Sequence, residues 1–286
     1  MAVRIDLHTH STVSDGTESP AELVRAAAAT GLEAVALTDH DSTAGWAEAT
    51  EQAERCGIEL VPGMEVTCQD PRGISVHLLS YYQDPRDEAL LGEIERTRRA
   101  RRVRARLMVE LLAEDYPITW DDVLAQAGRD ATVGRPHIAD ALVAAGVAPN
   151  RSAVFATILG GGSPYYVPHR AIDAVRAVRL VRAAGGVPVF AHPVASARGR
   201  VVGEETFEAM VEEGLAGVEV HHRDNPEAGR RWLLDLAARH DLLVTGSSDY
   251  HGEGKPNRLG ENTTDPEVLA AIREMAGRKP LNPSGG

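Results

Sequence analysis

The chain has 286 residues, of which 43% are hydrophobic, and carries a formal net charge of −12. This length suits one large domain or a barrel with an insertion, and the hydrophobic fraction is sufficient for a buried core. The excess of acidic residues argues against binding to a DNA duplex and against broad nonspecific binding to nucleic acid, because nucleic acids are themselves polyanions.

Three further features narrow the class of protein. The first residues, MAVRIDLHTH, lack the basic start and the long apolar segment of a signal peptide, and no apolar run reaches the length of a membrane span. The two cysteines, Cys56 and Cys68, are too few for a disulfide framework. We therefore expect a cytoplasmic protein with no membrane partner, whose oligomeric state the sequence does not indicate.

The first third of the chain alternates strand and helix patterns. We predict strands over residues 3–7, 34–37, 58–66 and 74–81. One helix is predicted over residues 20–30, and another follows the second strand and ends at about residue 55. Ser19 and Glu22 form a capping box around Pro20, which is typical of a helix start. This βαβα order predicts a parallel sheet, either a barrel or a doubly wound fold.

The pattern then becomes helical, with no convincing strand from about residue 85 to 165. We interpret residues 85–165 as an inserted helical subdomain that divides the barrel into residues 1–84 and 166–280. In the second part, helices predicted over 171–184, 204–213, 226–240 and 265–276 alternate with strands over 187–191, 217–221 and 242–246. Residues 281–286 are rich in Pro, Gly and Ser, and we expect a disordered tail there.

Histidines and acids cluster where the predicted strands end. His8 and His10 are two residues apart on a strand, so both imidazoles point to one face and can reach one cation. His77, taken alone, has a packed core histidine as its alternative, and Glu65, taken alone, is more typical of an ordinary surface acid. The recurrence of the pattern is the stronger signal, because carboxylates and imidazoles at strand ends build metal sites in barrels. The candidate metal ligands are His8, His10, Asp15, His40, Glu65, His77, His192, Asp249 and His251.

The order of these motifs (HxH with a following Asp, then TDH, Glu, His, AHP and DxH) resembles the PHP (polymerase and histidinol phosphatase) family from about residue 4 to 260. The resemblance implies a distorted (β/α)7 barrel that binds three divalent metals, most simply Mn²⁺, with Fe²⁺ or Zn²⁺ as alternatives. It assigns one metal to His8, His10, Glu65 and Asp249, a second to Glu65, His77 and His192, and a third to Asp15, His40 and His251. Asp15, Glu65, His192 and Asp249 are the residues that we expect to act in catalysis.

Within this family, the stretches DLHTHSTVSDG, ALTDHDS, GRPHIADALV and YYVPHR are most similar to small stand-alone phosphoesterases. The resemblance implies hydrolysis of a 3',5'-nucleoside bisphosphate to a nucleoside 5'-phosphate, by attack of a hydroxide that bridges the metals. A 5'-to-3' exoribonuclease acting on the end of a short RNA is one alternative, and a non-catalytic metal-stabilised module is another. An amidohydrolase that cleaves C–N bonds is a third, although its usual carboxylated lysine has few candidates in this chain.

Seven arginines lie in the stretch ERTRRARRVRARL, residues 95–107. We expect Leu91, Ile94, Val103, Leu107 and Leu111 to form the buried stripe of this helix, and most of the arginines to form a solvated face. One or two arginines could instead bind phosphate through bidentate hydrogen bonds. Residues 134–137 open a helix whose N-terminus suits an anion, with plain capping as the alternative. The candidate substrate-binding residues are Arg101, Arg104, Arg135, His137, His169 and His222.

Overall fold

The computed structural model describes residues 3–128, 131–160, 162–168 and 170–277. Seven strands form one curved sheet in the order β1-β2-β3-β4-β6-β7-β8, and a short strand β5 pairs with β3 beside this path. The strands span Ile5–Asp6 (β1), Ala34–Leu37 (β2), Glu59–Gln69 (β3), Ser75–Tyr81 (β4), Ile172–Asp173 (β5), Val187–Phe190 (β6), Gly217–His221 (β7) and Leu243–Gly246 (β8).

The sheet closes at the exits of its first and last strands. Thr9 and Tyr250 form a parallel bridge, and the amide of His10 donates to the carbonyl of Tyr250 at 2.8 Å. This closure brings the loop after β1 against the loop after β8. The predicted distorted (β/α)7 barrel is therefore confirmed.

The all-parallel sheet expected from the βαβα order is wrong at one strand. β4 runs antiparallel to both of its neighbours, β3 and β6. The connection from β3 to β4 covers only residues 70–74, and a parallel crossover needs a dozen residues or more. Asp70 tightens this turn, because its carboxylate accepts from the amides of Arg72 and Ile74 at 2.9 and 2.7 Å.

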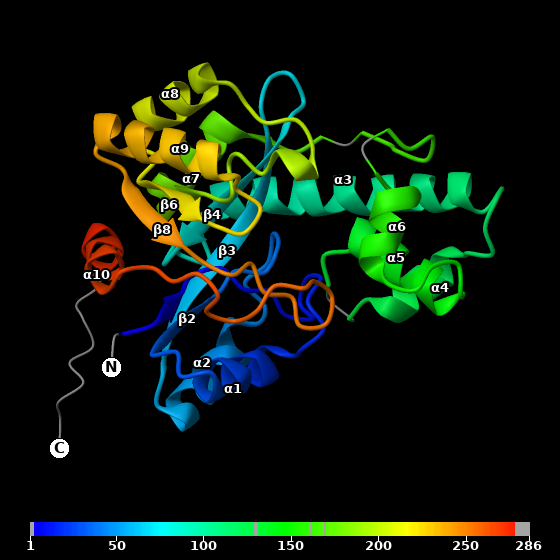
Figure 1. Ribbon diagram of the computed structural model, residues 1–286, viewed down its shortest axis with the longest axis horizontal. Helices are drawn as coiled ribbons and strands as arrows, with labels where there is room; N and C mark the ends of the chain where they lie inside the picture. Colours follow the sequence, from blue (N-terminus) through cyan, green and yellow to red (C-terminus); the bar gives the residue numbers. More distant parts are fainter. Residues whose placement is uncertain (1–2, 129–130, 161, 169, 278–286) are drawn as a thin grey trace.

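Helices cover both flanks of the barrel (Figure 1). α1 (Pro20–Ala29) and α2 (Trp46–Cys56) lie on one flank, and α7 (Ala174–Ala183), α8 (Glu204–Glu212) and α9 (Glu227–His240) lie on the other. α10 (Pro266–Met275) lies near one end of the barrel. The predicted capping box at the start of α1 is present, with Ser19 Oγ accepting from Glu22 N and Glu22 accepting from Ser19 N. Among the described residues, no helix has both the length and the apolar content needed to cross a bilayer.

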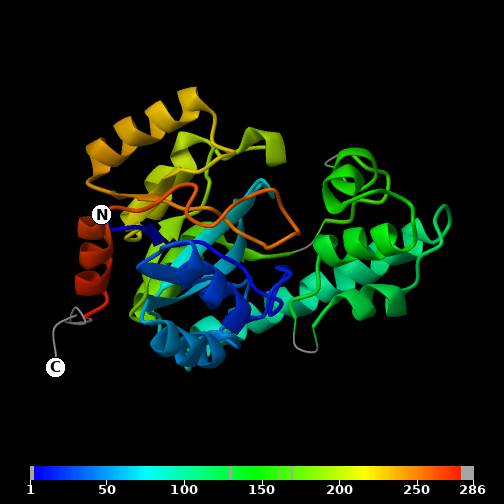
Figure 2. The same ribbon diagram turned by 60° about the horizontal axis from the view of Figure 1, so that its bottom comes forward.

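A helical lobe projects from the barrel and is joined to it by one long helix (Figure 2). α3 (Glu88–Leu112) packs its first turns on the barrel and its last turns on α4 (Trp120–Gln126), α5 (Arg135–Ala144) and α6 (Arg151–Thr157). The lobe has its own apolar core, which includes Met108, Leu112, Ile138 and Leu142. The described part of residues 85–165 contains no strand, as expected.

The predicted buried stripe of α3 is wrong at four of its five positions. Leu91, Val103, Leu107 and Leu111 are exposed, and Val103 reaches 59% exposure. α3 buries two different faces instead, Leu90, Ile94 and Thr97 against the barrel and Ala105, Met108, Val109 and Leu112 in the lobe. A single stripe assumes one partner surface, whereas this helix leaves the barrel and enters a second core. The tail expected over 281–286 lies outside the described residues.

Candidate metal centre

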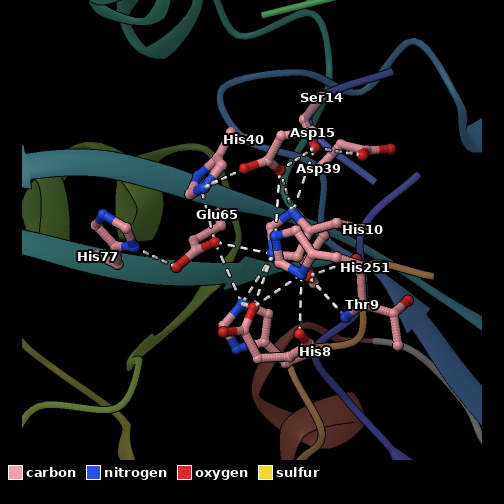
Figure 3. A network of polar contacts seen from close by, with 12 residues as sticks. His8, Thr9, His10, Ser14, Asp15, Asp39, His40, Glu65, His77 and His251 are labelled. Carbon is pink, nitrogen blue, oxygen red and sulfur yellow. Dashed lines mark hydrogen bonds and ion pairs between the residues drawn. The ribbon is translucent and has the colours of Figure 1, made fainter. Parts of the chain in front are cut away.

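The nine candidate ligands come together where the barrel strands end. Figure 3 shows seven of them, and the ion-pair distances place His192 next to Glu65 and Asp249 next to His8. Backbone hydrogen bonds that continue beyond the strand ends bring these side chains together. Glu65 N donates to Thr38 O at 3.0 Å and Asp41 N donates to Glu65 O at 3.0 Å, so the loop after β2 is held along β3 and His40 lies beside Glu65. His192 and Asp249 sit in the left-handed region, with φ of 32° and 53°. Such strain in non-glycine residues is typical of functional sites.

Glu65 is the centre of the cluster. Its Oε2 lies 3.0 Å from His10 Nε2 and 3.2 Å from both His8 Nε2 and His40 Nδ1. Its Oε1 lies 2.6 Å from His77 Nδ1 and 3.3 Å from His192 Nε2. Burial alone would raise the pKa of Glu65, but the neighbouring imidazoles, His40 first, hold it well below its usual range. Glu65 is therefore a carboxylate with both oxygens directed at imidazoles.

Two further carboxylates complete the cluster. Asp15 Oδ1 lies 3.2 Å from His251 Nε2 and 3.7 Å from His10 Nδ1. Asp249 Oδ1 lies 3.4–3.5 Å from His8, His10 and His251. Its other oxygen is bound by Arg198 Nη2 at 2.7 Å and by Lys255 Nζ at 2.9 Å. Asp249 thus turns one oxygen toward the imidazoles and the other toward two cations.

The geometry forms three groups whose ligand atoms lie within 4.8 Å of one another. One group contains His8, His10, Glu65 and Asp249, as the family resemblance implies. The other two differ from the implied sets. Asp15 and His251 group with His10, and His40 groups with Glu65 and His77. His192 remains next to Glu65 and stacks on His8, with ring centroids 5.7 Å apart.

The chemistry of this donor set fits divalent metal ions. His40 Nδ1, His192 Nε2 and His251 Nε2 are buried without a hydrogen-bond partner among the described residues, although each lies within 3.3 Å of a carboxylate oxygen. Buried polar atoms in native proteins are normally satisfied. Imidazole nitrogens and carboxylate oxygens are expected to lie close together without forming hydrogen bonds when they surround a common cation. Imidazole and carboxylate ligands without thiolate suit Mn, Fe or Zn.

The imidazoles of the cluster differ in their pKa and therefore in their protonation state. Burial lowers the pKa of His192 to about 3 and that of His251 to about 4, with the cations Arg198 and Lys255 adding to the effect. These rings are neutral at physiological pH, as a metal ligand must be. His10 behaves in the opposite way, because the carboxylates Asp249 and Glu65 outweigh its burial and raise its pKa to about 9. His10 must therefore lose a proton when it binds a metal.

Three buried acids, Glu219, Asp6 and Asp39, hydrogen-bond to the ligands or to the segments that carry them. Sequence reasoning missed Glu219 and Asp6. Glu219 on β7 accepts from His8 Nδ1 at 3.0 Å and from the amide of His192 at 2.8 Å. Asp6 accepts from the amides of Ser248 and Gly260. The only signal for Glu219 was a carboxylate within the apolar strand GVEVH. Such partners fix ring orientation and tautomer of metal-binding histidines.

Asp39, the acid of the TDH motif, supports the ligand His10 through a serine. Its carboxylate accepts from the amide and hydroxyl of Ser11 at 2.8 and 2.7 Å, and from Ser14 Oγ at 2.6 Å. Ser14 Oγ in turn lies 3.3 Å from His10 Nδ1. Figure 3 shows this chain from Asp39 to His10.

A cavity of about 670 Å³ lies between the cluster and the helical lobe. Asp15 and His40 open into it from the barrel, and Arg104 and Arg135 open into it from the lobe. Burial and the charge of Arg135 lower the pKa of Arg104 to about 10. Arg104 Nε donates to the carbonyl of Val167 at 2.6 Å, and the Arg135 guanidinium lies 5.5 Å from the Phe155 ring. Neither guanidinium forms an ion pair with a described carboxylate.

The other predicted substrate-binding residues have different surroundings. Arg101 lines the cavity, but its guanidinium donates to Thr67 Oγ1 at 2.6 Å and pairs with Asp41. His137 accepts from the amide of Gly134 at 3.2 Å, which is the capping contact considered as its alternative. His222 is buried, with Nε2 3.6 Å from Asp249. His169 lies outside the described residues. Sequence reasoning missed Arg151, Arg198, Arg223 and Lys255, which line the cavity.

Comparison with known proteins identifies relatives over nearly the whole chain. The PHP domain family matches residues 6–118. A 3',5'-nucleoside bisphosphate phosphatase from Chromobacterium violaceum is 34% identical, covering 96% of this chain and 97% of the relative. A phosphoribosyl 1,2-cyclic phosphate 1,2-diphosphodiesterase from Eggerthella lenta is 33% identical, with 87% and 94% covered. A 5'-3' exoribonuclease from Haemophilus influenzae is 34% identical, with 92% and 95% covered.

A solved structure agrees with these relatives. A protein from Bifidobacterium adolescentis, proposed to be a metal-dependent phosphoesterase, superimposes with a TM-score of 0.94 at 48% identity, covering 98% of both chains. The family resemblance carried by the HxH, TDH, AHP and DxH motifs is therefore confirmed. The chain belongs to the PHP family and is a metal-dependent phosphoesterase.

Proposed function

We propose that this enzyme removes the 3'-phosphate from a 3',5'-nucleoside bisphosphate and releases a nucleoside 5'-phosphate. The observation that carries the proposal is the pair Arg104 and Arg135, half-buried guanidiniums that pair with no described carboxylate and line the same cavity as Asp15 and His40 of the metal cluster. A substrate with two phosphates can occupy both ends of such a cavity. The relative from Chromobacterium violaceum, which is named for this activity, supports the same substrate class.

Different residues of the cavity would bind different parts of the substrate. Arg104 and Arg135 bind the phosphate that is not cleaved, and Ala105, Met108 and Phe155 line an apolar part of the same cavity. This wall suits the nucleoside, because a base stacks readily on aromatic and apolar side chains. The ligands around Glu65 would hold the divalent cations at the part of the cavity where the reacting phosphate lies. When bound, divalent cations supply Lewis acidity and offset the negative charge of the phosphate ester.

The metal content is part of the proposal. We propose three Mn²⁺ ions, held by the three ligand groups together with His192, and catalytic contributions from Asp15, Glu65, His192 and Asp249. The three groups of ligand atoms, which share His10 and Glu65, support this number. Metal analysis of the purified protein, loaded with Mn²⁺ and dialysed, should find three equivalents per chain. Two equivalents or fewer would contradict a trinuclear site.

We also propose that residues 85–165 form an inserted subdomain within a barrel made of residues 1–84 and 166–280. The separate core of the lobe, built on Met108 and Leu142, supports this division. The lobe supplies Arg104 and Arg135, so it would determine which anion can bind. The barrel alone would then provide the metals without this selectivity.

A second cation group favours an RNA end as the alternative substrate. Arg223 and Lys255 line the opposite wall of the large cavity, from the loops after β7 and β8. A nucleotide with a single additional phosphate would not need both walls, whereas the backbone of a short RNA could use them. The relative from Haemophilus influenzae, a 5'-3' exoribonuclease, belongs to this class.

The test is an assay of Mn²⁺-loaded protein with adenosine 3',5'-bisphosphate beside a 5'-phosphorylated oligoribonucleotide. Release of inorganic phosphate from the first compound alone supports the proposal, and release of mononucleotides from the second supports the alternative. Arg104→Met should raise KM for the bisphosphate about 10- to 100-fold, since a charge-assisted hydrogen bond contributes about 1.5–3 kcal/mol.

Arg102→Met provides the matched control, because Arg102 lies on the same helix with its guanidinium 5.6 Å from the Trp120 ring and does not line the cavity. Its KM should stay within about twofold of the wild-type value, as for a surface substitution. Equal KM values for the two variants would contradict the assignment of Arg104.

A further inference from the structure

The metal cluster opens into a second, smaller cavity. This cavity has a volume of about 110 Å³ and is lined by the cluster residues His77 and His192. The large cavity contacts the cluster through Asp15 and His40 instead. Arg135 and Arg198 line both cavities and therefore stand at the boundary between them. The cluster thus borders two adjoining cavities.

The smaller cavity has the chemistry of a site for a small anion. Three guanidiniums, those of Arg135, Arg198 and Arg200, line it, and no described acid does. Arg198 is paired with Asp224 and Asp249, and Arg135 is shared with the large cavity, so Arg200 is the guanidinium that belongs to this cavity alone. Arg200 donates to the carbonyl of Arg72 at 3.4 Å and forms no ion pair with a described carboxylate. The ring of His192, whose Nε2 is directed at Glu65, lines the same cavity.

The two cavities differ in volume and therefore in the ligands that they can hold. The smaller cavity, at about 110 Å³, lies well below the roughly 300–1,000 Å³ of sites for whole small-molecule ligands. Inorganic phosphate can enter a space of this size, and a nucleoside cannot. The large cavity, at about 670 Å³, is within the range of roughly 300–1,000 Å³ that is usual for whole small-molecule ligands.

We propose that the smaller cavity is a binding and release site for the inorganic phosphate product. This inference rests on the proposed phosphatase function. In that reaction one water molecule is consumed: its oxygen bonds to phosphorus, the P–O bond to the nucleoside breaks, and the nucleoside oxygen takes up a proton. Entering and leaving oxygens lie roughly in line on opposite sides of phosphorus. The nucleoside then departs through the large cavity, and phosphate passes Arg200 through the smaller one.

The test is the dissociation constant of inorganic phosphate, measured by calorimetry on Mn²⁺-loaded protein. Arg200→Met removes a guanidinium that lines only the smaller cavity, and Val201→Phe fills that cavity without changing charge, at a position that is 41% exposed. Both variants should weaken phosphate binding about tenfold or more. Binding of adenosine 5'-monophosphate, which occupies the large cavity, should stay within about twofold of wild type.

Arg72→Met is the matched control. Arg72 is adjacent to Arg200, is paired with Asp70 and Glu205, and does not line the cavity. Phosphate binding unchanged in Arg200→Met, or weakened equally in Arg72→Met, would overturn the proposal. If wild-type protein releases no phosphate from a bisphosphate but binds phosphate through Arg200, the proposed substrate is wrong and the anion site stands.

Discussion

Glu219→Gln is expected to impair metal binding although Glu219 belongs to none of the candidate ligand groups. Glu219 is fully buried, and its Oε1 accepts from His8 Nδ1 at 3.0 Å and from Ser247 Oγ at 2.8 Å. Its Oε2 accepts from the amide of His192 at 2.8 Å. An amide keeps the shape of the carboxylate but replaces one of these two acceptor oxygens with a donor.

Either orientation of the new amide is unfavourable. With its NH2 toward His192, two donors face each other in a buried site. With its NH2 toward His8, the ring must accept at Nδ1, so the proton moves to Nε2, which is the atom directed at Glu65 and Asp249. Loss of such a partner lowers metal affinity about 10- to 100-fold, or about 1.4–2.7 kcal/mol.

The assay is competition between the protein and a fluorescent chelator for Mn²⁺, with circular dichroism to establish that the variant is folded. Glu227→Gln is the control, since Glu227 is exposed on α9 and pairs only with Arg231 among the described residues. A folded Glu219→Gln variant that binds Mn²⁺ within about twofold of wild type would refute this account of the ring orientation.

Three other outcomes are expected. Glu65→Ala removes the carboxylate shared by five imidazoles, so phosphoesterase activity and at least one equivalent of bound Mn²⁺ should be lost, as metal analysis would report. Mn²⁺ affinity should rise with pH up to about 9, because His10 is protonated below its raised pKa and must release that proton to bind a metal. Calorimetry in two buffers of different ionisation enthalpy would detect the released proton. An affinity that does not change with pH would contradict this prediction. Leu142→Ala should cost about 2–5 kcal/mol of unfolding free energy in denaturant titrations and leave Mn²⁺ affinity unchanged, since Leu142 lies in the lobe core.

The sequence by itself indicated an alternating α/β sheet, which the family resemblance specified as a barrel, and it gave the positions of the candidate metal ligands. Ala34–Leu37 is an apolar run of strand length followed directly by Thr38-Asp39-His40, and the structure has a strand with those bounds. His8 and His10 share a face because side chains alternate along an extended chain. Such information is local, so periodicity and motif order are sufficient to recover it.

Only the tertiary structure decided how these groups meet. Glu219 reaches His8 across 211 residues, and Arg198 and Lys255 converge on Asp249 from two different loops. The direction of β4 and the two buried faces of α3 likewise depend on partner surfaces distant in the chain. A sequence pattern records the polarity of each residue, but contacts across a closed barrel arise from its closure, which brings the loops after β1 and β8 together.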